Sequence, residues 1–241
     1  MDSPPRPPSP SARGERPTLR EVHCGDGRAW LEAATLGPSD AVVTSLPDVS
    51  ELPDGDLETW RPWFIDTAQL ACRAIHDESV IIFYQTDIKR DGRWIDKGFL
   101  VQLAAEQSGL SCLFHKVVCR VQPGTTTFGR PAYAHLLAFS RSLRLEVARS
   151  LPDVLPEMGF LPWSRAMGVE ACAFVCRFLA RETPARRVID PFCGLGTMLA
   201  VANAHGFDAV GVEISKKRAR RARRLALPLE GVPSEGEAAR A

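Results

Sequence analysis

The sequence is short of the features that mark membrane or secreted proteins. No apolar run approaches the roughly 18 residues that span a bilayer, and the N-terminus lacks the apolar core of a signal peptide. Its seven cysteines follow no framework spacing, so we expect reduced thiols and a cytoplasmic location. Cys172 and Cys176 lie one helical turn apart, but no CxxC pair or nearby histidine completes a metal site, so we expect core residues.

An excess of charge of either sign is also missing. The formal net charge is +1, so any nucleic-acid binding would have to come from a local patch. The densest basic run extends over residues 216–224. A solvated helix face is its favoured interpretation, and a phosphate-binding or localisation role is the alternative. The five histidines show no ligand spacing, and we expect neither a metal nor a catalytic histidine.

Composition divides the chain into three parts. Residues 1–16 are rich in proline, serine and arginine and are predicted to form a disordered tail, as are residues 230–241. Residues 17–229 have the apolar content of a globular protein, with no internal repeat and no convincing internal boundary. They predict one domain.

Apolar patterning within this domain alternates between strands and helices. Buried strands are expected at 18–24, 40–45, 79–85, 187–190 and 209–213. Helices are expected at 30–34, 57–75, 97–107, 166–181, 197–204 and 216–227. This alternation predicts an α/β fold with a mainly parallel twisted sheet and helices on both faces. Residues 110–122 and 133–140 flank a turn-rich stretch and predict an antiparallel hairpin at the edge of the sheet.

One glycine-containing loop, Asp190–Thr197, carries the strongest chemical signal because it follows a β-branched strand and begins a helix. Gly194 and Gly196 allow a tight turn and close approach of a ligand. The free N–H groups at the start of the helix suit a carboxylate. Glu213 ends the next strand, where it can accept hydrogen bonds from two ribose hydroxyls. The alternatives are a structural turn or a dinucleotide fingerprint, and the missing third glycine weakens the latter.

The residues Asp-Pro-Phe-Cys-Gly-Leu-Gly-Thr closely resemble the D-P-F-x-G-S/T-G-T motif of the methyltransferases that modify exocyclic nitrogens of bases. The resemblance implies a Rossmann-like methyltransferase fold and S-adenosylmethionine as the cofactor. Gly25-Asp26 followed by Trp30-Leu31 resembles a segment of that family whose aspartate lies near the adenine. The cofactor-binding residues implied are Asp26, Asp190, Pro191, Phe192, Gly194, Gly196, Thr197 and Glu213.

The order of motifs is similar to that of the family's permuted branch, in which the catalytic half precedes the cofactor motif, and it extends over residues 18–227. Ser45-Leu46-Pro47-Asp48 falls where the family has T-S-P-P-Y or D-P-P-Y. In the family, a side-chain oxygen and the first proline's carbonyl accept the hydrogens of the target amine, and the aromatic residue stacks on the flipped base. Ser45, Leu46, Pro47 and Asp48 are therefore the predicted catalytic residues, with the acceptor pair retained and the stacking ring lost.

Asp48 has two interpretations. It accepts a proton or hydrogen bond from the nucleophile, or it caps a turn or is simply exposed. Ser50 is a possible cap of a helix beginning here. Replacement stacking would come from one of four aromatic residues, although core packing is favoured for most of them. These residues are Trp60, Trp63, Tyr84 and Phe128.

The function predicted from these motifs is methyl transfer to a nucleic-acid base. RNA is slightly preferred over DNA, because only residues 141–163 occupy the place where DNA-reading family members carry a recognition region. Lys89, Arg93 and Trp94 follow a strand whose end lines the crevice and are candidate contacts to phosphate or ribose. The alternatives are a catalytically silent cofactor-binding protein that serves a protein partner, or a methyltransferase of a small molecule or protein. A homodimer is possible, and no membrane partner is expected.

Overall fold

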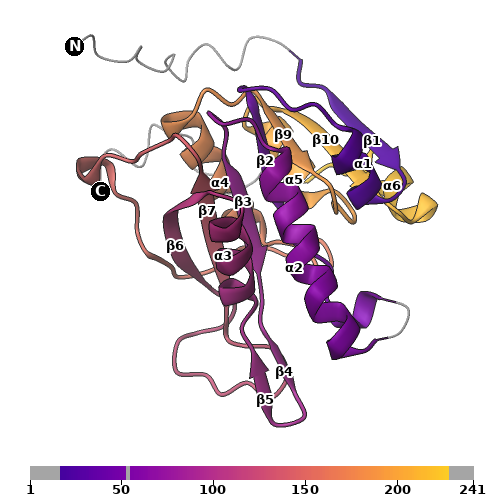
Figure 1. The fold of residues 1–241 in the computed structure, drawn as a ribbon, viewed down its shortest axis with the longest axis vertical. Helices are drawn as coiled ribbons and strands as arrows, with labels where there is room; N and C mark the ends of the chain where they lie inside the picture. The colour runs from indigo at the N-terminus through magenta and orange to yellow at the C-terminus, as the bar shows by residue number, and fades with distance from the viewer. Residues whose placement is uncertain (1–16, 53–54, 228–241) are drawn as a thin grey trace.

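The computed structural model describes residues 17–52 and 55–227, and the predicted disordered tails lie outside the described residues. An eight-stranded sheet of order β1-β10-β9-β2-β3-β7-β6-β8 forms the centre (Figure 1). Its strands are β1 Arg20–Cys24, β2 Asp40–Thr44, β3 Ile81–Gln85, β6 Ser111–Cys119, β7 Tyr133–Ser140, β8 Val154–Leu155, β9 Arg187–Asp190 and β10 Asp208–Glu213. Within this sheet, β7 alone runs opposite to the others, pairing antiparallel with both β3 and β6.

Helices cover both faces of the sheet. One face carries α1 Gly27–Ala33, α2 Leu57–Ala74 and α3 Lys97–Gln107, and the other carries α4 Val169–Glu182, α5 Thr197–Ala204 and α6 Lys216–Ala222. Trp60 and Phe64 of α2 are fully buried against the first face, and Cys172 and Cys176 of α4 are fully buried against the second, as predicted for core residues. No helix in the described part of the chain is both long and apolar enough to cross a bilayer.

The fold class expected from the sequence is confirmed. Strands alternate with helices, the sheet is mainly parallel, and β6 and β7 form the expected antiparallel pair. This pair lies one strand in from the edge, because the short β8 adds to β6 in parallel. The domain boundaries at 17 and 229 and the cytoplasmic location remain predictions.

The pairing of β2 with β9 brings distant parts of the chain together. These parallel strands align Val42 with Ile189, and Thr44 Oγ1 donates a hydrogen bond of 2.8 Å to Asp190 Oδ1. Parallel strands end at the same side of a sheet. The predicted catalytic loop after β2 and the cofactor loop after β9 therefore begin side by side, although 146 residues separate Thr44 from Asp190 in sequence.

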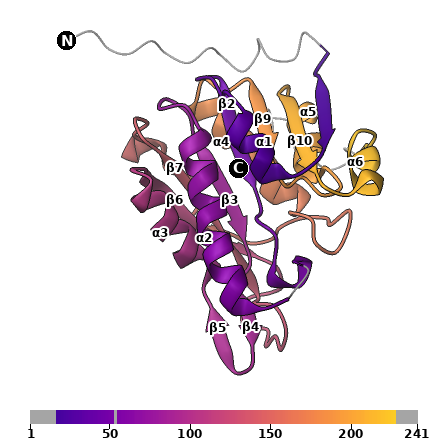
Figure 2. The same cartoon turned by 45° about the vertical axis from the view of Figure 1, so that its right-hand side comes forward.

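A second, two-stranded sheet was not expected. β4 Ile88–Arg90 and β5 Arg93–Ile95 form a hairpin that projects beyond the main sheet (Figures 1 and 2). Asp91 and Gly92 connect the strands with φ angles of 52° and 70°. An Asp-Gly pair is a favoured two-residue hairpin turn because both positions need positive φ. This pair is the signal in the sequence that predicts the hairpin.

Several helix boundaries differ from the expected ones. α4 begins at Val169 rather than 166, because Gly168 caps it where a Cβ would lie 1.9 Å from the Met158 carbonyl oxygen. α6 ends at Ala222 rather than 227. There Arg20 Nη1 donates to the carbonyl oxygens of Ala222 and Leu225 at 3.3 and 2.6 Å, satisfying groups that the helix end leaves free.

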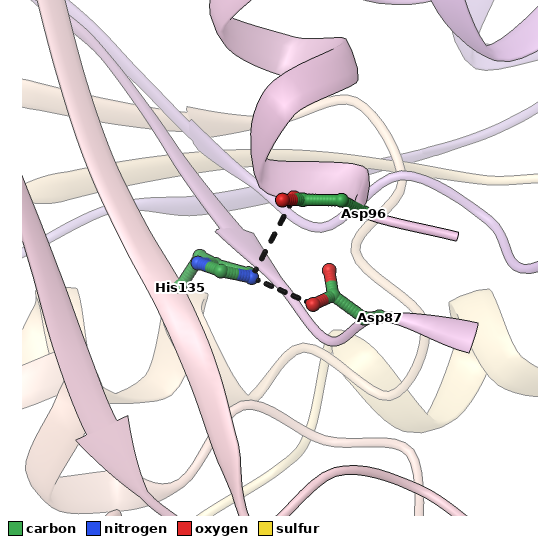
Figure 3. Close-up of side chains that lie close together, drawn as sticks. All are labelled: Asp87, Asp96 and His135. Atoms are coloured by element: carbon green, nitrogen blue, oxygen red, sulfur yellow. Dashed lines mark hydrogen bonds and ion pairs between the residues drawn. The ribbon is translucent and has the colours of Figure 1, made fainter. Parts of the chain in front are cut away.

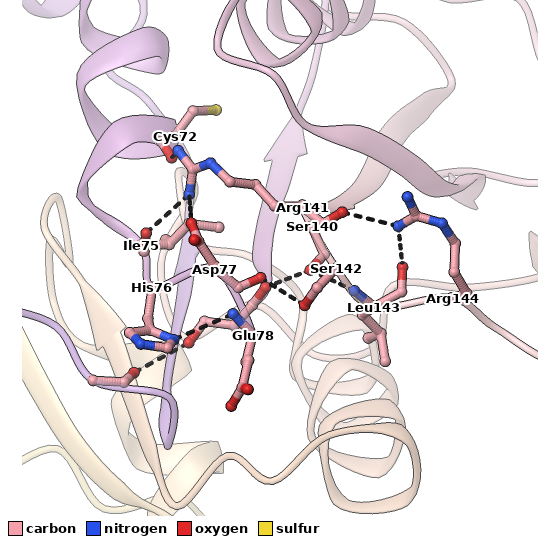
Figure 4. Close-up of polar contacts among 12 residues, drawn as sticks. Cys72, Ile75, His76, Asp77, Glu78, Ser140, Arg141, Ser142, Leu143 and Arg144 are labelled. Atoms are coloured by element: carbon pink, nitrogen blue, oxygen red, sulfur yellow. Dashed lines mark hydrogen bonds and ion pairs between the residues drawn. The ribbon is translucent and has the colours of Figure 1, made fainter. Parts of the chain in front are cut away.

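A hydrogen-bond network joins the C-terminal end of α2, the start of β3 and the end of β7 (Figure 4). Arg141, just after β7, donates to the carbonyls of Cys72 and Ile75, each at 3.0 Å. These carbonyls belong to the C-terminal end of α2, where a cation is favoured by the helix dipole. Ser140 Oγ donates to the Ser79 carbonyl at 2.7 Å, which joins the start of β3 to the end of β7.

Candidate active site

A cavity of about 410 Å³ opens at the C-terminal ends of β2, β9 and β10. The predicted residues that line it come from the catalytic loop, the cofactor loop, the start of α1 and the end of β10: Ser45, Leu46, Pro47, Asp190, Pro191, Phe192, Gly194, Thr197, Asp26 and Glu213. Gly196 and Asp48 are the two predicted residues of these sets outside its lining. Segments identified separately in the sequence thus enclose one space.

Glycine at two positions permits this packing. A Cβ on Gly27 would lie 2.1 Å from the Pro191 carbonyl oxygen, so the start of α1 touches the cofactor loop only because residue 27 has no side chain. Gly194 has a φ of 56°, and a Cβ there would lie 2.8 Å from the Trp163 ring. The loop is therefore held between α1 and the segment that carries Trp163.

Asp190 is a buried carboxyl group on the wall of the cavity. It is 5% exposed and accepts hydrogen bonds from Thr44 Oγ1 at 2.8 Å and the Phe192 N–H at 3.1 Å. Burial raises its pKa to about 7, and the negative charge of Glu213 acts in the same direction. A cationic ligand group in the cavity would favour the charged form.

Thr197 begins α5 and carries a hydroxyl without a partner. The residue is 3% exposed, lines the cavity, and its Oγ1 makes no hydrogen bond with any described residue. The first amides of a helix also lack partners within the helix. This combination of donors is suited to an anionic group such as a carboxylate.

Glu213, at the end of the neighbouring strand β10, also lines the cavity and is 6% exposed. Its Oε1 accepts hydrogen bonds from the Ser215 N–H at 2.7 Å and from Arg218 Nε at 2.9 Å. Arg218 also lines the cavity, and Arg223 Nε donates to the Val22 carbonyl at 3.0 Å. The basic run 216–224 is therefore not only a solvated helix face, because Arg218 and Arg223 donate hydrogen bonds to groups of the folded protein.

The catalytic loop is held by groups other than the predicted acceptors. Trp60 Nε1 donates to the Pro47 carbonyl at 3.2 Å, while no side-chain hydrogen bond within the described residues engages Ser45 Oγ. Asp48 caps a 3-10 turn, Val49–Glu51, by accepting from the Ser50 N–H at 3.3 Å. The prediction of Ser50 as the cap was therefore wrong, because Asp48 occupies the cap position. Capping a turn was one of the interpretations of Asp48 given above.

The other carboxylate oxygen of Asp48 faces a buried lysine. Lys97 Nζ lies 3.5 Å from Asp48 Oδ2, and the lysine side chain is 4% exposed. Burial lowers the pKa of Lys97, and the charge of Asp48 opposes this effect. The pair lies on a second cavity of about 50 Å³, which shares Ser45 and Leu46 with the large one.

The three predicted substrate contacts lie elsewhere. Lys89, Arg93 and Trp94 belong to the β4–β5 hairpin and line neither cavity. Lys89 Nζ donates to the Thr127 carbonyl at 2.9 Å, which joins the hairpin to the loop between β6 and β7. Trp94 is half exposed, and its Nε1 donates to Asp87 Oδ2 at 2.8 Å.

A histidine with two aspartates lies at the base of this hairpin (Figure 3). His135 Nε2 is 3.0 Å from Asp87 Oδ2 and 3.9 Å from Asp96 Oδ1. Potential metal-ligand atoms of these residues all lie within 4.8 Å of one another. Asp87 also accepts hydrogen bonds from Trp94 Nε1 and from the Lys97 N–H, each at 2.8 Å. These bonds join the hairpin to the start of α3, so a structural role explains the cluster.

Solved structures of other proteins resemble this architecture. The PvuII DNA methyltransferase, which is cytosine-N4-specific, matches with a TM-score of 0.67 at 16% identity over 88% of this chain and 90% of that one. A candidate DNA modification methylase from Thermus thermophilus, solved with S-adenosyl-L-methionine, matches with a TM-score of 0.64 at 19% identity over 85% and 91%. M1.HpyAVI, in a complex with the same compound, gives 0.57 at 11% identity over 87% and 100%.

The chain has the fold of DNA methyltransferases. No family model and no curated protein sequence matches it, so the likeness is one of structure. The expectation of a Rossmann-like methyltransferase fold is confirmed.

Within this methyltransferase fold, the sequence missed residues that only folding brings to the site. Trp163 and Arg165 lie at and just after the end of residues 141–163, and Lys97 is the first residue of α3. Of the four aromatic residues considered for stacking, Trp63 lines the large cavity and Tyr84 the small one, while Trp60 is fully buried and Phe128 is 92% exposed. A loop aromatic directly after a proline, as Trp163 is, was the signal available.

Proposed function

We propose that the chain is a member of the permuted amino-methyltransferase family and transfers a methyl group from S-adenosylmethionine to a nucleic-acid base. One observation carries the proposal: a single cavity is lined both by the glycine loop after β9 and by Ser45–Pro47 after β2. The named activities of the structurally similar proteins support it.

The cavity offers a complementary partner for each charged or polar part of the cofactor. The unpartnered Thr197 hydroxyl and the start of α5 suit the carboxylate of its methionine part, and the Asp190 carboxylate suits the ammonium. Glu213 would accept from the ribose hydroxyls, with Asp26 and Phe192 towards the adenine. Pro191, Gly194 and Gly196 shape the loop. When bound, the cofactor supplies an electrophilic methyl group.

The residues of the second loop orient the target amine. Ser45 Oγ and the Leu46 carbonyl oxygen would accept hydrogen bonds from its two N–H groups, which directs the nitrogen lone pair towards the methyl donor. The hydrogen bond from Trp60 to the Pro47 carbonyl fixes the loop and leaves the preceding carbonyl for this task. Asp48 holds the turn through its cap and through Lys97. In-line placement of the amine is then the main contribution of the protein.

We propose DNA as the first substrate to examine. The preference for RNA rested on the short segment 141–163 and receives no support from the similar structures, whose names refer to DNA. The exposed hairpin residues Arg93 and Trp94, with Lys89 behind them, are proposed contacts to the backbone of the nucleic acid.

The test measures cofactor binding and methyl transfer separately. Calorimetry should detect S-adenosylmethionine binding that Glu213→Ala weakens strongly. Transfer of labelled methyl groups to DNA should fall by about 10²-fold or more in Ser45→Ala, a loss typical of removing a preorganised acceptor, while cofactor binding persists. Absence of cofactor binding would refute the proposal. Binding without transfer to DNA or RNA would select the silent protein, and label only in protein or small molecules would select another substrate.

A further inference from the structure

We propose that the small cavity beside the catalytic loop is an anion site that holds a phosphate group of the substrate. The inference rests on the proposed function and adds what lies next to the methylated group. Because this cavity shares Ser45 and Leu46 with the cofactor cavity, whatever occupies it lies beside the predicted acceptors.

Charge in this cavity is unbalanced. Its lining contains four cationic side chains and two carboxylates, since Lys97, Arg120, Arg130 and Arg165 face Asp48 and Glu51. Each carboxylate already has a cation: Lys97 lies 3.5 Å from Asp48, and Arg165 lies 3.1 Å from Glu51. Two arginines therefore remain.

Arg120 and Arg130 form no ion pair with any described residue. Arg120 is half-buried at the end of β6, and its side chain donates to the Pro131 carbonyl at 3.3 Å. Burial lowers the pKa of Arg120, Tyr84 opposes this effect, and the positive charge of Arg130 adds to it, so an anion beside the two arginines would favour the charged form of Arg120. A guanidinium pair of this kind matches the oxygen geometry of phosphate.

The size of the cavity also favours a phosphate over a base. About 50 Å³ accommodates a group the size of a few water molecules. The lining offers no exposed aromatic face on which a base would stack, since Tyr84 is 5% exposed. The loss of the family's aromatic residue at Asp48 is consistent with this polar environment.

A phosphate here has two possible sources with the same chemistry. It belongs either to the backbone at the target nucleotide of a nucleic acid or to a free nucleotide. Both place a phosphate ester near the methylated base, and the experiment therefore includes both, together with inorganic phosphate as the minimal probe.

The test compares Arg120→Gln and Arg130→Gln with Arg73→Gln, an exposed residue in the last turn of α2. Fluorescence anisotropy with a short single-stranded oligonucleotide, and calorimetry with nucleoside monophosphates and inorganic phosphate, measure binding without catalysis. We expect the dissociation constant of the phosphate ligand to rise about tenfold in each pocket variant, with partial recovery in Arg120→Lys. The control should bind like the parent.

Cofactor binding, measured in the same variants, separates this inference from the proposed function. If S-adenosylmethionine binds equally to all variants while oligonucleotide and nucleotide affinities do not change, the anion site is refuted and the methyltransferase proposal stands. Because Arg130 is exposed, its variant tests the site even if Arg120→Gln destabilises the fold. A parent protein that binds none of the three phosphate ligands would also refute it.

Discussion

At the residue scale, the contact between Gly27 and Pro191 is open to a simple test. Alanine at 27 would place a Cβ 2.1 Å from a backbone oxygen, and the neighbouring chain would have to move. We expect Gly27→Ala to lower the free energy of unfolding by about 1–3 kcal/mol and to weaken cofactor binding. Helix propensity alone would make the alanine variant more stable, so a loss of stability would be due to the steric clash. Gly25→Ala is the control, because nothing lies within 4 Å of its Cβ; equal stabilities in denaturant titrations would contradict the assignment.

The buried carboxyl of Asp190 predicts a pH dependence of cofactor binding. Its pKa is raised to about 7 by burial, so the carboxylate that would attract the cofactor's ammonium forms only as the pH rises through this value. We expect affinity to increase from pH 5.5 to 7.5 by up to about tenfold per pH unit below the pKa, and to fall again above about pH 8 as an α-amino group loses its proton.

Calorimetric titrations over this range measure that dependence. Asp190→Asn retains the shape of the side chain but removes the titration, so the increase below pH 7.5 should disappear in this variant. An unchanged slope in Asp190→Asn would assign the dependence to another group.

Single residues also show which lining residues of the cavity could be named from the sequence and which could not. Asp190 and Glu213 were recognisable because each ends a parallel strand, where such sheets bind their ligands, and Gly194 because it lies in the glycine-containing loop after β9. Lys97 was not recognisable. It lies at the start of a helix, and the sequence around it does not indicate that its side chain contacts Asp48 from a distant part of the chain. Burial of such a pair is decided by tertiary packing.

At the scale of elements, strand and helix positions followed from apolar periodicity, and α3, β7, β9 and α5 have the bounds expected. Two of the boundary errors, at the start of α4 and the end of α6, occur where long-range contacts set the end of the element. The β4–β5 hairpin was missed for a different reason. Its strands have three residues each, too short to show an alternating pattern, and the Asp-Gly turn between them was the usable signal.

The end of α2 depends on one arginine. Arg141 gives two hydrogen bonds to carbonyls at the end of this helix and lies 3.5 Å from Asp77 (Figure 4). We expect Arg141→Ala to lower the free energy of unfolding by about 1–3 kcal/mol, because carbonyls at the helix end lose charged donors. Arg144→Ala removes an exposed arginine from the same segment and should cost less than about 0.5 kcal/mol. Urea titrations measure both, and similar losses would count against the capping role.

At the scale of the whole molecule, positive charge is concentrated locally and the protein has no large net charge. The net charge is only +1, yet exposed cations occur on the projecting hairpin and at the small cavity, on the side where the strands end. Non-specific attraction of a polyanion should therefore be weak. Affinity for nucleic acid should depend on a few local contacts, each of which releases counterions from the backbone.

Arg93 at the hairpin provides the measurement. If Arg93 contacts a backbone phosphate, Arg93→Gln should weaken binding of DNA of any sequence and reduce the slope of log affinity against log salt by about 1. Arg144 follows the end of β7, which lies beside the start of β3, whereas the hairpin follows the end of β3, so Arg144→Gln removes the same charge far from the hairpin and should leave the slope unchanged. Anisotropy titrations at several salt concentrations measure both slopes. If the two variants give the same slope as the parent, the hairpin does not contact the backbone, and the nucleic acid reaches the catalytic loop by another face.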